Sequence, residues 1–277
     1  MAGDLGPHGR ITLILRSTID DCLAVAISLA REAGDMAMKG RRHGLSHVAT
    51  KSTLTDMVTE YDRASETLVV EGLRTRRSSD SIIGEEGAAH TGDSELTWYV
   101  DPIDGTTNFY FDLPMWAVSI GVTDTTGPLA GVVYVPALGE MFSGSRGGGA
   151  FMNGHPISVR PNDTLADALV CTGFSYSAEA RVRQSRRIPH IIDKVRDLRR
   201  FGAAAVDLCF VAAGRLDAYF EENLHMWDLV AGHVIATEAG AIVTDFSGAP
   251  VRPEEVMAST PAIHSDLVSL LAAARAD

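Results

Sequence analysis

Apolar residues recur at the spacing of an amphipathic helix in two stretches near the start of the chain. The first stretch predicts a helix that Ser17-Thr18 would cap and Gly40 would end, after about ten residues that we expect to form a loose tail. Its apolar positions are Cys22, Ala26, Leu29, Ala33 and Met36. The second predicted helix covers residues 60–77, and its expected apolar face carries Ala64, Leu68 and Leu73.

Short apolar segments follow, and they predict strands, several of them joined by glycine-containing turns. These strands lie at residues 81–84, 97–100, 117–123, 129–136 and 140–143. In the last part of the chain, predicted helices alternate with predicted strands, the helices at 187–198, 204–213 and 227–239 and the strands at 218–221 and 241–244. We therefore expect a mixed α/β fold, with an N-terminal half (residues 1–155) and a C-terminal half (residues 156–277) that pack as one functional unit.

Composition narrows the class of protein. The 277 residues are 45% hydrophobic and 22% charged, which is typical of a globular protein with a sizeable core. Asp and Glu outnumber Lys and Arg by 36 to 24, a net charge of −12, and this balance makes nucleic-acid binding unlikely. The three cysteines form no C-x-x-C pair, and no apolar run is long enough for a transmembrane helix, so we expect a cytoplasmic protein that needs no membrane.

Candidate chemistry is densest where the predicted strand at 97–100 runs into Asp101-Pro102-Ile103-Asp104. Asp101 and Asp104 can aim their carboxylates at one site across a turn that proline stiffens. Asp104 is also expected to cap a helix that begins at Gly105-Thr106, and the amides of these two residues would then form an anion site. Taken alone, the pattern favours an ordinary Asp-Pro turn with a capped helix.

Two further acidic residues strengthen the case for a metal site. Glu85 follows the predicted strand at 81–84, and Asp228 opens the predicted helix at 227–239. Each alone could be a solvated acid or an acid that complements a helix dipole. Together with Asp101 and Asp104 they supply hard carboxylate oxygens, which suit Mg²⁺ or Mn²⁺ rather than zinc.

At these residues the sequence resembles the inositol monophosphatase family, within the lithium-sensitive, Mg²⁺-dependent phosphatase superfamily. Five segments carry the resemblance: Lys51-Ser52 with residues 56–62, Gly84-Glu85-Glu86, and residues 101–109, 201–208 and 227–232. Any one of them would be weak, but five in the same order and spacing are specific. The resemblance extends from about residue 17 to residue 270.

The resemblance implies a layered αβαβα sandwich, usually a homodimer, that hydrolyses a small phosphate monoester with two or three Mg²⁺ ions. The implied metal ligands are Glu85, Asp101, the Ile103 carbonyl, Asp104 and Asp228. The implied catalytic residues that orient or activate the attacking water are Asp62 and Thr106, with Glu85 beside them. The implied substrate-binding residues are Gly105 and Thr106 for the phosphate and Gly202, Ala204 and Glu221 for the polyol. Ala203 departs from the family pattern, because many relatives carry serine there, and one hydroxyl contact is thereby lost.

The substrate stays open at this point. Glu221, seven residues before Asp228, favours inositol 1-phosphate, but relatives also hydrolyse fructose 1,6-bisphosphate, histidinol phosphate or nucleotide 3'-phosphates. A second class of function is a regulatory protein that keeps the fold and binds RNA or a transcription complex. The basic residues between Arg181 and Arg200 could serve such binding, although interleaved acids favour a solvated helix face.

Overall fold

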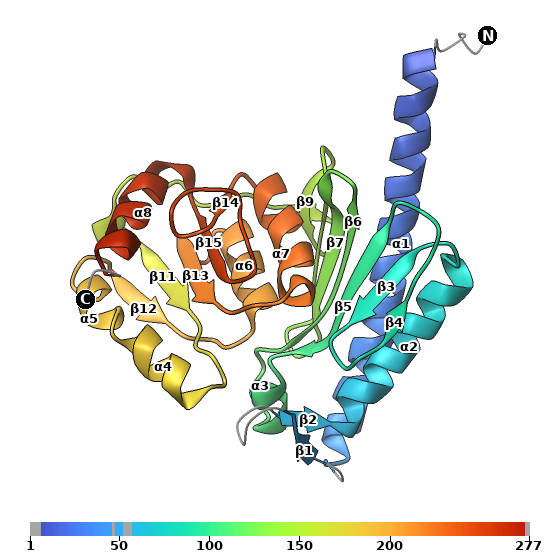
Figure 1. Cartoon of the computed structure of the whole chain (residues 1–277), viewed down its shortest axis with the longest axis horizontal. Helices are drawn as coiled ribbons and strands as arrows, with labels where there is room; N and C mark the ends of the chain where they lie inside the picture. Colours follow the sequence, from blue (N-terminus) through green and yellow to red (C-terminus); the bar gives the residue numbers. More distant parts are fainter. Residues whose placement is uncertain (1–6, 46–47, 52–56, 275–277) are drawn as a thin grey trace.

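Two β-sheets alternate with three layers of helices in the computed structural model, which describes residues 7–45, 48–51 and 57–274 (Figure 1). The αβαβα sandwich that the resemblance implied is therefore confirmed. None of the helices within these ranges has the length and apolarity needed to cross a membrane. The division of the chain at residue 155 stays a prediction.

The first sheet has eight strands in the order β10-β9-β8-β7-β6-β5-β3-β4. Neighbours pair antiparallel except β3 and β5, which are parallel. The strands are β3 Ser81–Gly84, β4 Ala89–His90, β5 Thr97–Asp104, β6 Ala117–Asp124, β7 Gly127–Val135, β8 Glu140–Ser145, β9 Gly149–Met152 and β10 His155–Pro156. A separate two-stranded ribbon pairs β1 (Val48–Thr50) with β2 (Met57–Thr59).

The second sheet has five strands in the order β12-β11-β13-β15-β14. Strand β11 is parallel to β12 and β13, whereas β15 is antiparallel to both of its neighbours. The strands are β11 Leu169–Thr172, β12 Asp197–Arg199, β13 Ala218–Glu222, β14 Ile242–Thr244 and β15 Glu255–Ser259.

The helices fall into the three layers that cover these sheets. Helices α1 (Pro7–Arg42) and α2 (Glu60–Arg76) pack on the outer face of the first sheet around Trp98 and Ile120. Helices α6 (Ala204–Ala212) and α7 (Met226–Glu238) form the middle layer between the sheets. Helices α5 (Ile188–Ile191) and α8 (His264–Ala273) cover the outer face of the second sheet, and α4 (Ala178–Ser185) lies beside them in Figure 1. Short helix α3 (Thr106–Tyr110) follows β5, and single 3₁₀ turns occupy Leu165–Asp167 and Pro261–Ile263.

Two predictions about helix extent are wrong. Helix α1 begins at Pro7 and runs through Ser17-Thr18, so these residues are not its cap and residues 7–10 are not a loose tail. The predicted helix at 187–198 is instead α5 followed by turns and β12. Because Leu198 pairs with Val170 of β11, sheet formation overrides the local helical pattern there. Strands β11 and β15 and helices α4 and α8 were not predicted.

Three glycines that are neighbours across the first sheet allow α7 to approach it closely. Gly121 of β6 lies opposite Gly131 of β7, which in turn lies opposite Gly144 of β8. A Cβ atom on Gly131 would lie 2.5 Å from the Ala231 Cα, and one on Gly121 would lie 2.8 Å from the Ala231 amide nitrogen. The backbone of α7 therefore rests on a surface without side chains, and the start of the helix is held over β5.

We expect Gly131→Ala to lower the free energy of unfolding by about 1–3 kcal/mol, because the added methyl group would meet helix backbone that cannot step aside. Gly144→Ala is the matched comparison, since its Cβ would lie 3.1 Å from the Ile235 Cα and needs only a small adjustment. Urea unfolding of the two variants measures the difference. Equal stability of both variants would contradict the close-approach argument.

Candidate functional site

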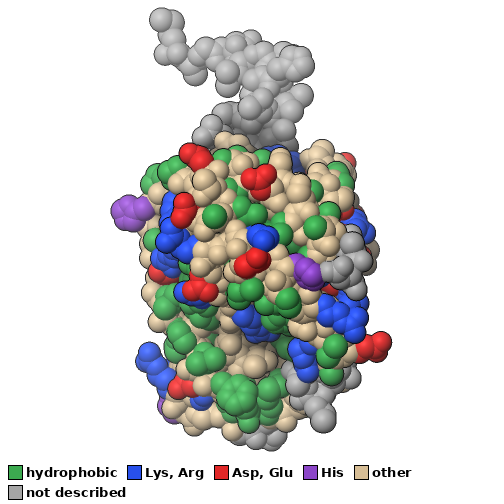
Figure 2. Space-filling view, turned by 90° about the vertical axis from the view of Figure 1, so that its left-hand side faces the viewer, with side chains coloured by type: hydrophobic (Ala, Val, Ile, Leu, Met, Phe, Trp, Pro, Cys, Tyr) green, Lys and Arg blue, Asp and Glu red, His purple; other side chains and the backbone are tan. Residues whose placement is uncertain are grey.

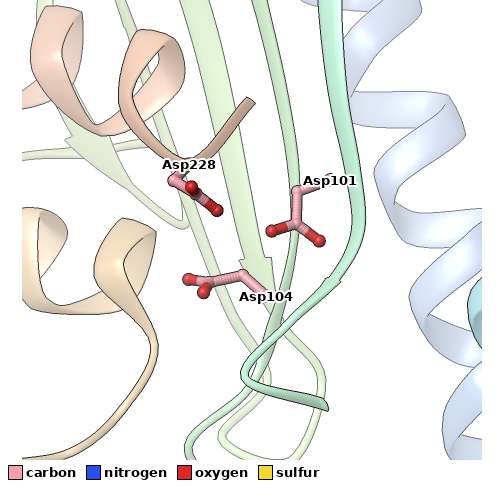
Figure 3. A group of neighbouring side chains, drawn as sticks. All are labelled: Asp101, Asp104 and Asp228. Atoms are coloured by element: carbon pink, nitrogen blue, oxygen red, sulfur yellow. The ribbon is translucent and has the colours of Figure 1, made fainter. Parts of the chain in front are cut away.

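Three aspartate side chains converge at the junction between the first sheet and the middle helices. Asp101 and Asp104 come from the end of β5, and Asp228 comes from the first turn of α7. One carboxylate oxygen of each residue lies within 4.8 Å of one oxygen of each of the other two, and Figure 3 shows the three side chains around a common space. The structure thus brings together three of the four side chains predicted as metal ligands.

A β-bulge explains why two residues three apart on one strand face the same space. Asp101 lies opposite Ser119 and Asp104 lies opposite Ala117. Between these two pairs, β5 therefore contains one residue more than β6. In a regular strand, residues three apart point to opposite faces, and the extra residue reverses one of them. The amide of Ile103 also donates to Asp101 Oδ1 at 3.0 Å. The expected Asp-Pro turn is therefore a bulged extension of β5.

Asp104 does not cap the helix that follows it, contrary to the prediction. The N-cap of α3 is Gly105, whose positive φ of 88° suits glycine, and it makes no side-chain capping bond. Asp104 instead accepts hydrogen bonds from the Ala204 amide (3.1 Å) and the Ala205 amide (2.8 Å). These amides open α6, so the carboxylate reaches another layer of the fold and complements the positive end of its dipole.

The three carboxylates fit a divalent cation. Burial raises the pKa of Asp101 well above its usual range, and the charges of Glu85, Asp104 and Asp228 raise it further. Burial followed by the charge of Asp104 likewise raises the pKa of Asp228. No Lys or Arg of the described ranges forms an ion pair with any of the three. A hard cation would supply the missing positive charge, and oxygen donors are the ligands that Mg²⁺ and Mn²⁺ prefer.

Glu85 lies beside this cluster and has a cation of its own. Its Oε1 is 2.7 Å from Lys51 Nζ, which also approaches Glu86 Oε1 at 2.5 Å. The charge of Glu85 contributes to the raised pKa of Asp101, so the two carboxylates are near each other. Its role as a metal ligand stays a prediction, as does that of the Ile103 carbonyl. Residues 52–56, part of one motif that carried the resemblance, lie outside the described residues.

Helix α2 positions the segments that carry the acidic residues, through buried polar side chains that the sequence pattern did not identify. Of the predicted apolar face, Leu73 is buried and half-buried Leu68 packs against the same core, whereas Ala64 is exposed, so the prediction is wrong at Ala64. The buried residues are Asp62, Ser65, Glu66, Val69 and Leu73. Ser65 Oγ donates to the Pro102 carbonyl at 3.0 Å, and Glu66 accepts from the Glu86 and Ala88 amides at 2.8 and 3.0 Å. One helix face thus positions both β5 and the turn that carries Glu85.

Asp62 and Thr106, which were predicted to orient or activate a water, form a hydrogen-bonded pair. Thr106 Oγ1 lies 3.1 Å from Asp62 Oδ1 and 3.1 Å from the Ile103 carbonyl oxygen. Asp62 Oδ2 accepts from the amide and the hydroxyl of Thr59. Burial raises the pKa of Asp62 to about 6, against the hydrogen bonds from Thr59, which lower it.

The predicted substrate-binding residues lie next to the carboxylate cluster. A Cβ on Gly105 would lie 3.1 Å from the Ala203 Cβ, so the start of α3 touches the segment of Gly202 and Ala204. Asn108, which the sequence analysis missed, donates to the Phe201 carbonyl at 2.7 Å and holds that segment. The charge of Glu221 contributes to the raised pKa of Asp104, which places Glu221 on the same side.

The basic residues between Arg181 and Arg200 do not form the single helix face that was predicted. They are divided among α4, β12, the segments on either side of α5 and the residue after β12. Five of them pair with acids of the same chain: Arg183 and Arg187 with Glu222, Lys194 with Asp193, Arg196 with Asp167, and Arg199 with Asp197. Figure 2 shows this side of the molecule, where basic and acidic side chains are interspersed. Most of the local positive charge is therefore already compensated.

Comparison with known proteins identifies the class to which this fold and site belong. The model of the inositol monophosphatase family matches residues 19–276. Inositol monophosphatase 1 of Solanum lycopersicum is 39% identical over 263 residues, which cover 92% of this chain and 96% of the relative. The Nus factor SuhB of Pasteurella multocida (strain Pm70) is 40% identical over 234 residues, which cover 82% and 85%.

A solved structure agrees with these relatives. The extragenic suppressor protein suhB of Bartonella henselae has a TM-score of 0.85 and 34% identity, over 90% of this chain and 97% of that one. The chain therefore belongs to the inositol monophosphatase family.

We expect Asp101→Asn to raise the Tm of the protein in EDTA. Because the folded-state pKa of Asp101 lies above its unfolded value, the ionised carboxylate destabilises the metal-free fold at neutral pH. The same substitution should weaken the rise in Tm that added Mg²⁺ produces, because it removes one charged ligand.

Asp80→Asn is the matched control for this prediction. Asp80 is also buried, but it accepts hydrogen bonds from Arg77, Trp98 and Ser94, so its loss should lower the Tm with or without Mg²⁺. Differential scanning fluorimetry measures both effects. A lower Tm for Asp101→Asn in EDTA would argue against an uncompensated carboxylate cluster.

Proposed function

We propose that this protein hydrolyses a small polyol phosphate monoester, most readily inositol 1-phosphate, to the free polyol and phosphate with Mg²⁺. The observation that carries this proposal is the cluster of buried Asp101 and Asp104 with half-buried Asp228, in a chain of the inositol monophosphatase family. A cluster that lacks its own cation is suited to bind a metal together with a phosphate ester.

The cluster would hold Mg²⁺, in two or three ions, with Glu85 and the Ile103 carbonyl as further ligands. Mn²⁺ is a suitable substitute because it prefers the same oxygen donors. When bound, such ions neutralise the phosphate monoester and lower the pKa of a bound water. The amides of Gly105 and Thr106 would hold the phosphate oxygens.

Asp62 and Thr106 would position the attacking water. The Thr106 hydroxyl can donate its proton to Asp62 Oδ1, since the two atoms are 3.1 Å apart. The oxygen of Thr106 is then free to accept a hydrogen bond from the water and to fix its direction. Because hydrogen bonds from Thr59 occupy Asp62 Oδ2, only Oδ1 is directed to Thr106. Proximity and orientation of this kind contribute substantially to catalysis.

Glu221 would select the polyol, together with Gly202 and Ala204. Its carboxylate can accept hydrogen bonds from two neighbouring hydroxyl groups of the polyol. Ala203 in place of the family's frequent serine removes one hydroxyl contact from this side. Fructose 1,6-bisphosphate, histidinol phosphate and nucleotide 3'-phosphates remain the alternative substrates.

A second candidate function is regulation within a transcription complex. It is favoured by the 40% identity to the Nus factor SuhB of Pasteurella multocida. The compensated charges of the basic residues between Arg183 and Arg199 support a protein partner over direct binding of nucleic acid. We also propose a cytoplasmic homodimer, as is usual in the family. Pull-down of transcription factors by the purified protein tests the regulatory role.

The enzymatic proposal predicts Mg²⁺-dependent phosphate release from inositol 1-phosphate that exceeds release from the three alternative substrates. Purified protein is assayed against this panel at fixed Mg²⁺, with Asp101→Asn as the variant expected to lose turnover. Li⁺ should inhibit uncompetitively, because a small cation of half the charge can occupy a carboxylate site but stabilises the reacting phosphate poorly. Absence of phosphate release from every substrate would leave the regulatory function as the better interpretation.

Glu221→Gln should raise the KM for inositol 1-phosphate by about tenfold or more, because it removes the charge from a hydrogen-bond acceptor. p-Nitrophenyl phosphate has no hydroxyl groups to hold, so its KM should change little. Steady-state kinetics with both substrates measures the split. If both substrates lose activity equally, Glu221 serves the metal site or the fold, and if neither changes, the polyol assignment is wrong.

A further inference from the structure

Tyr219 holds one oxygen of the Glu221 carboxylate. The two residues are two apart on β13 and therefore project from the same face of the sheet. The Tyr219 hydroxyl donates to Glu221 Oε2 at 2.7 Å. Tyr219 is fully buried in the core between the second sheet and α6, so its ring offers a fixed donor. Among the described residues, no hydrogen bond reaches the other oxygen, Oε1.

Gly173 lacks a side chain and so leaves the space that the Glu221 carboxylate occupies. Cys171 of β11 is the neighbour of Tyr219, so the chain two residues further on runs beside Glu221. A Cβ on Gly173 would lie 1.8 Å from Glu221 Oε2, 2.0 Å from its Cδ and 2.1 Å from its Oε1. The whole carboxylate thus lies across the backbone of Gly173, in space that any side chain would fill.

We propose that Tyr219 and Gly173 are positioning residues that set the substrate preference of the site by fixing the orientation of Glu221. This inference rests on the proposed function, in which Glu221 accepts hydrogen bonds from the polyol. With Oε2 held by Tyr219 and the carboxylate packed against Gly173, Oε1 is presented to the ligand in one direction. A preorganised acceptor loses less conformational entropy on binding than a mobile one, so its hydrogen bonds contribute more to affinity.

The charge of Glu221 depends on the same contact. Burial raises the pKa of Glu221, and the hydrogen bond from Tyr219, followed by the charge of Arg200, opposes that rise. A hydrogen bond to an ionised acceptor is stronger than one to a neutral acceptor. Tyr219 therefore favours both the orientation and the ionised form that neighbouring hydroxyl groups need.

Two substitutions test this role in the full-length protein. Tyr219→Phe removes the donor and keeps the ring, while Gly173→Ala displaces the carboxylate without backbone strain, because the φ of Gly173 is not positive. We expect each to raise the ratio of the KM for inositol 1-phosphate to the KM for p-nitrophenyl phosphate by about three- to tenfold. In the double variant Tyr219→Phe/Glu221→Gln, the ratio should rise no further than in Glu221→Gln alone.

Tyr134→Phe is the matched control, because the Tyr134 hydroxyl donates to Asp35 Oδ1 at 2.8 Å in the outer layer, far from β13. It should leave the KM ratio as in the parent protein. Thermal unfolding of all variants separates a loss of stability from a change of preference. Gly173→Ala keeps the test decisive if Tyr219→Phe fails to fold.

Distinct outcomes overturn the inference and the proposed function. Unchanged KM ratios in Tyr219→Phe and Gly173→Ala, beside a raised ratio in Glu221→Gln, overturn the positioning role alone. Fully additive effects in the double variant also overturn it, because Tyr219 would then act independently of Glu221. An unchanged ratio in Glu221→Gln, or no Mg²⁺-dependent phosphate release by the parent protein, overturns the polyol function and the inference with it.

Discussion

The close approach of α7 to the first sheet determines where the charges of the candidate site can meet. Gly121, Gly131 and Gly144 present bare backbone to the helix, and Ser119 of the same sheet donates to the Trp227 carbonyl at its start. Asp228 is thereby brought to the end of β5. Two unit charges 4 Å apart repel by on the order of 4 kcal/mol at an effective dielectric constant of 20. Backbone packing in the middle layer must therefore hold the carboxylates together until a cation compensates them.

Helices α2 and α6 of two other layers also hold the site in place through hydrogen bonds. Helix α6 offers two amides to Asp104, while α2 contacts β5 through Ser65 and the turn after β3 through Glu66. Every carboxylate is thus attached to a rigid element, and none depends on a long loop for its position. Preorganised donors of this kind need no rearrangement when a ligand binds, which is the condition under which electrostatic catalysis is most effective.

The sequence allowed prediction of the residues whose chemistry is dense and local, and failed where distant segments decide the structure. Asp101 and Asp104 lie on one short segment, Glu85 and Asp228 were predicted from their places at the ends of predicted elements, and family resemblance added Glu221. Ser65 and Asn108 could not be predicted, because their partners lie 37 and 93 residues away. The helix predicted at 187–198 failed for the same reason, since its last part pairs with β11. The sequence did contain one indication of the polar contacts of α2. Asp62, Ser65 and Glu66 lie at helical spacing on the same face as Val69 and Leu73, which are buried.

Four acidic residues with different partners show how a carboxylate can stabilise the fold or instead form part of the site. Burial raises the pKa of Asp80 and Glu222, but hydrogen bonds from Arg77 to the former and from Arg187 to the latter outweigh it, and both pKa values are lowered. These acids stabilise the fold when ionised. Buried Asp101 and half-buried Asp228 lie among other carboxylates, with no paired cation among the described residues, and their pKa values are raised. The metal-free fold would be more stable with neutral side chains at these positions. The loss of stability that the carboxylates cause indicates that they serve to bind a ligand. For these four acids the direction of the pKa shift follows the partner, which is an arginine for Asp80 and Glu222 and other carboxylates for Asp101 and Asp228.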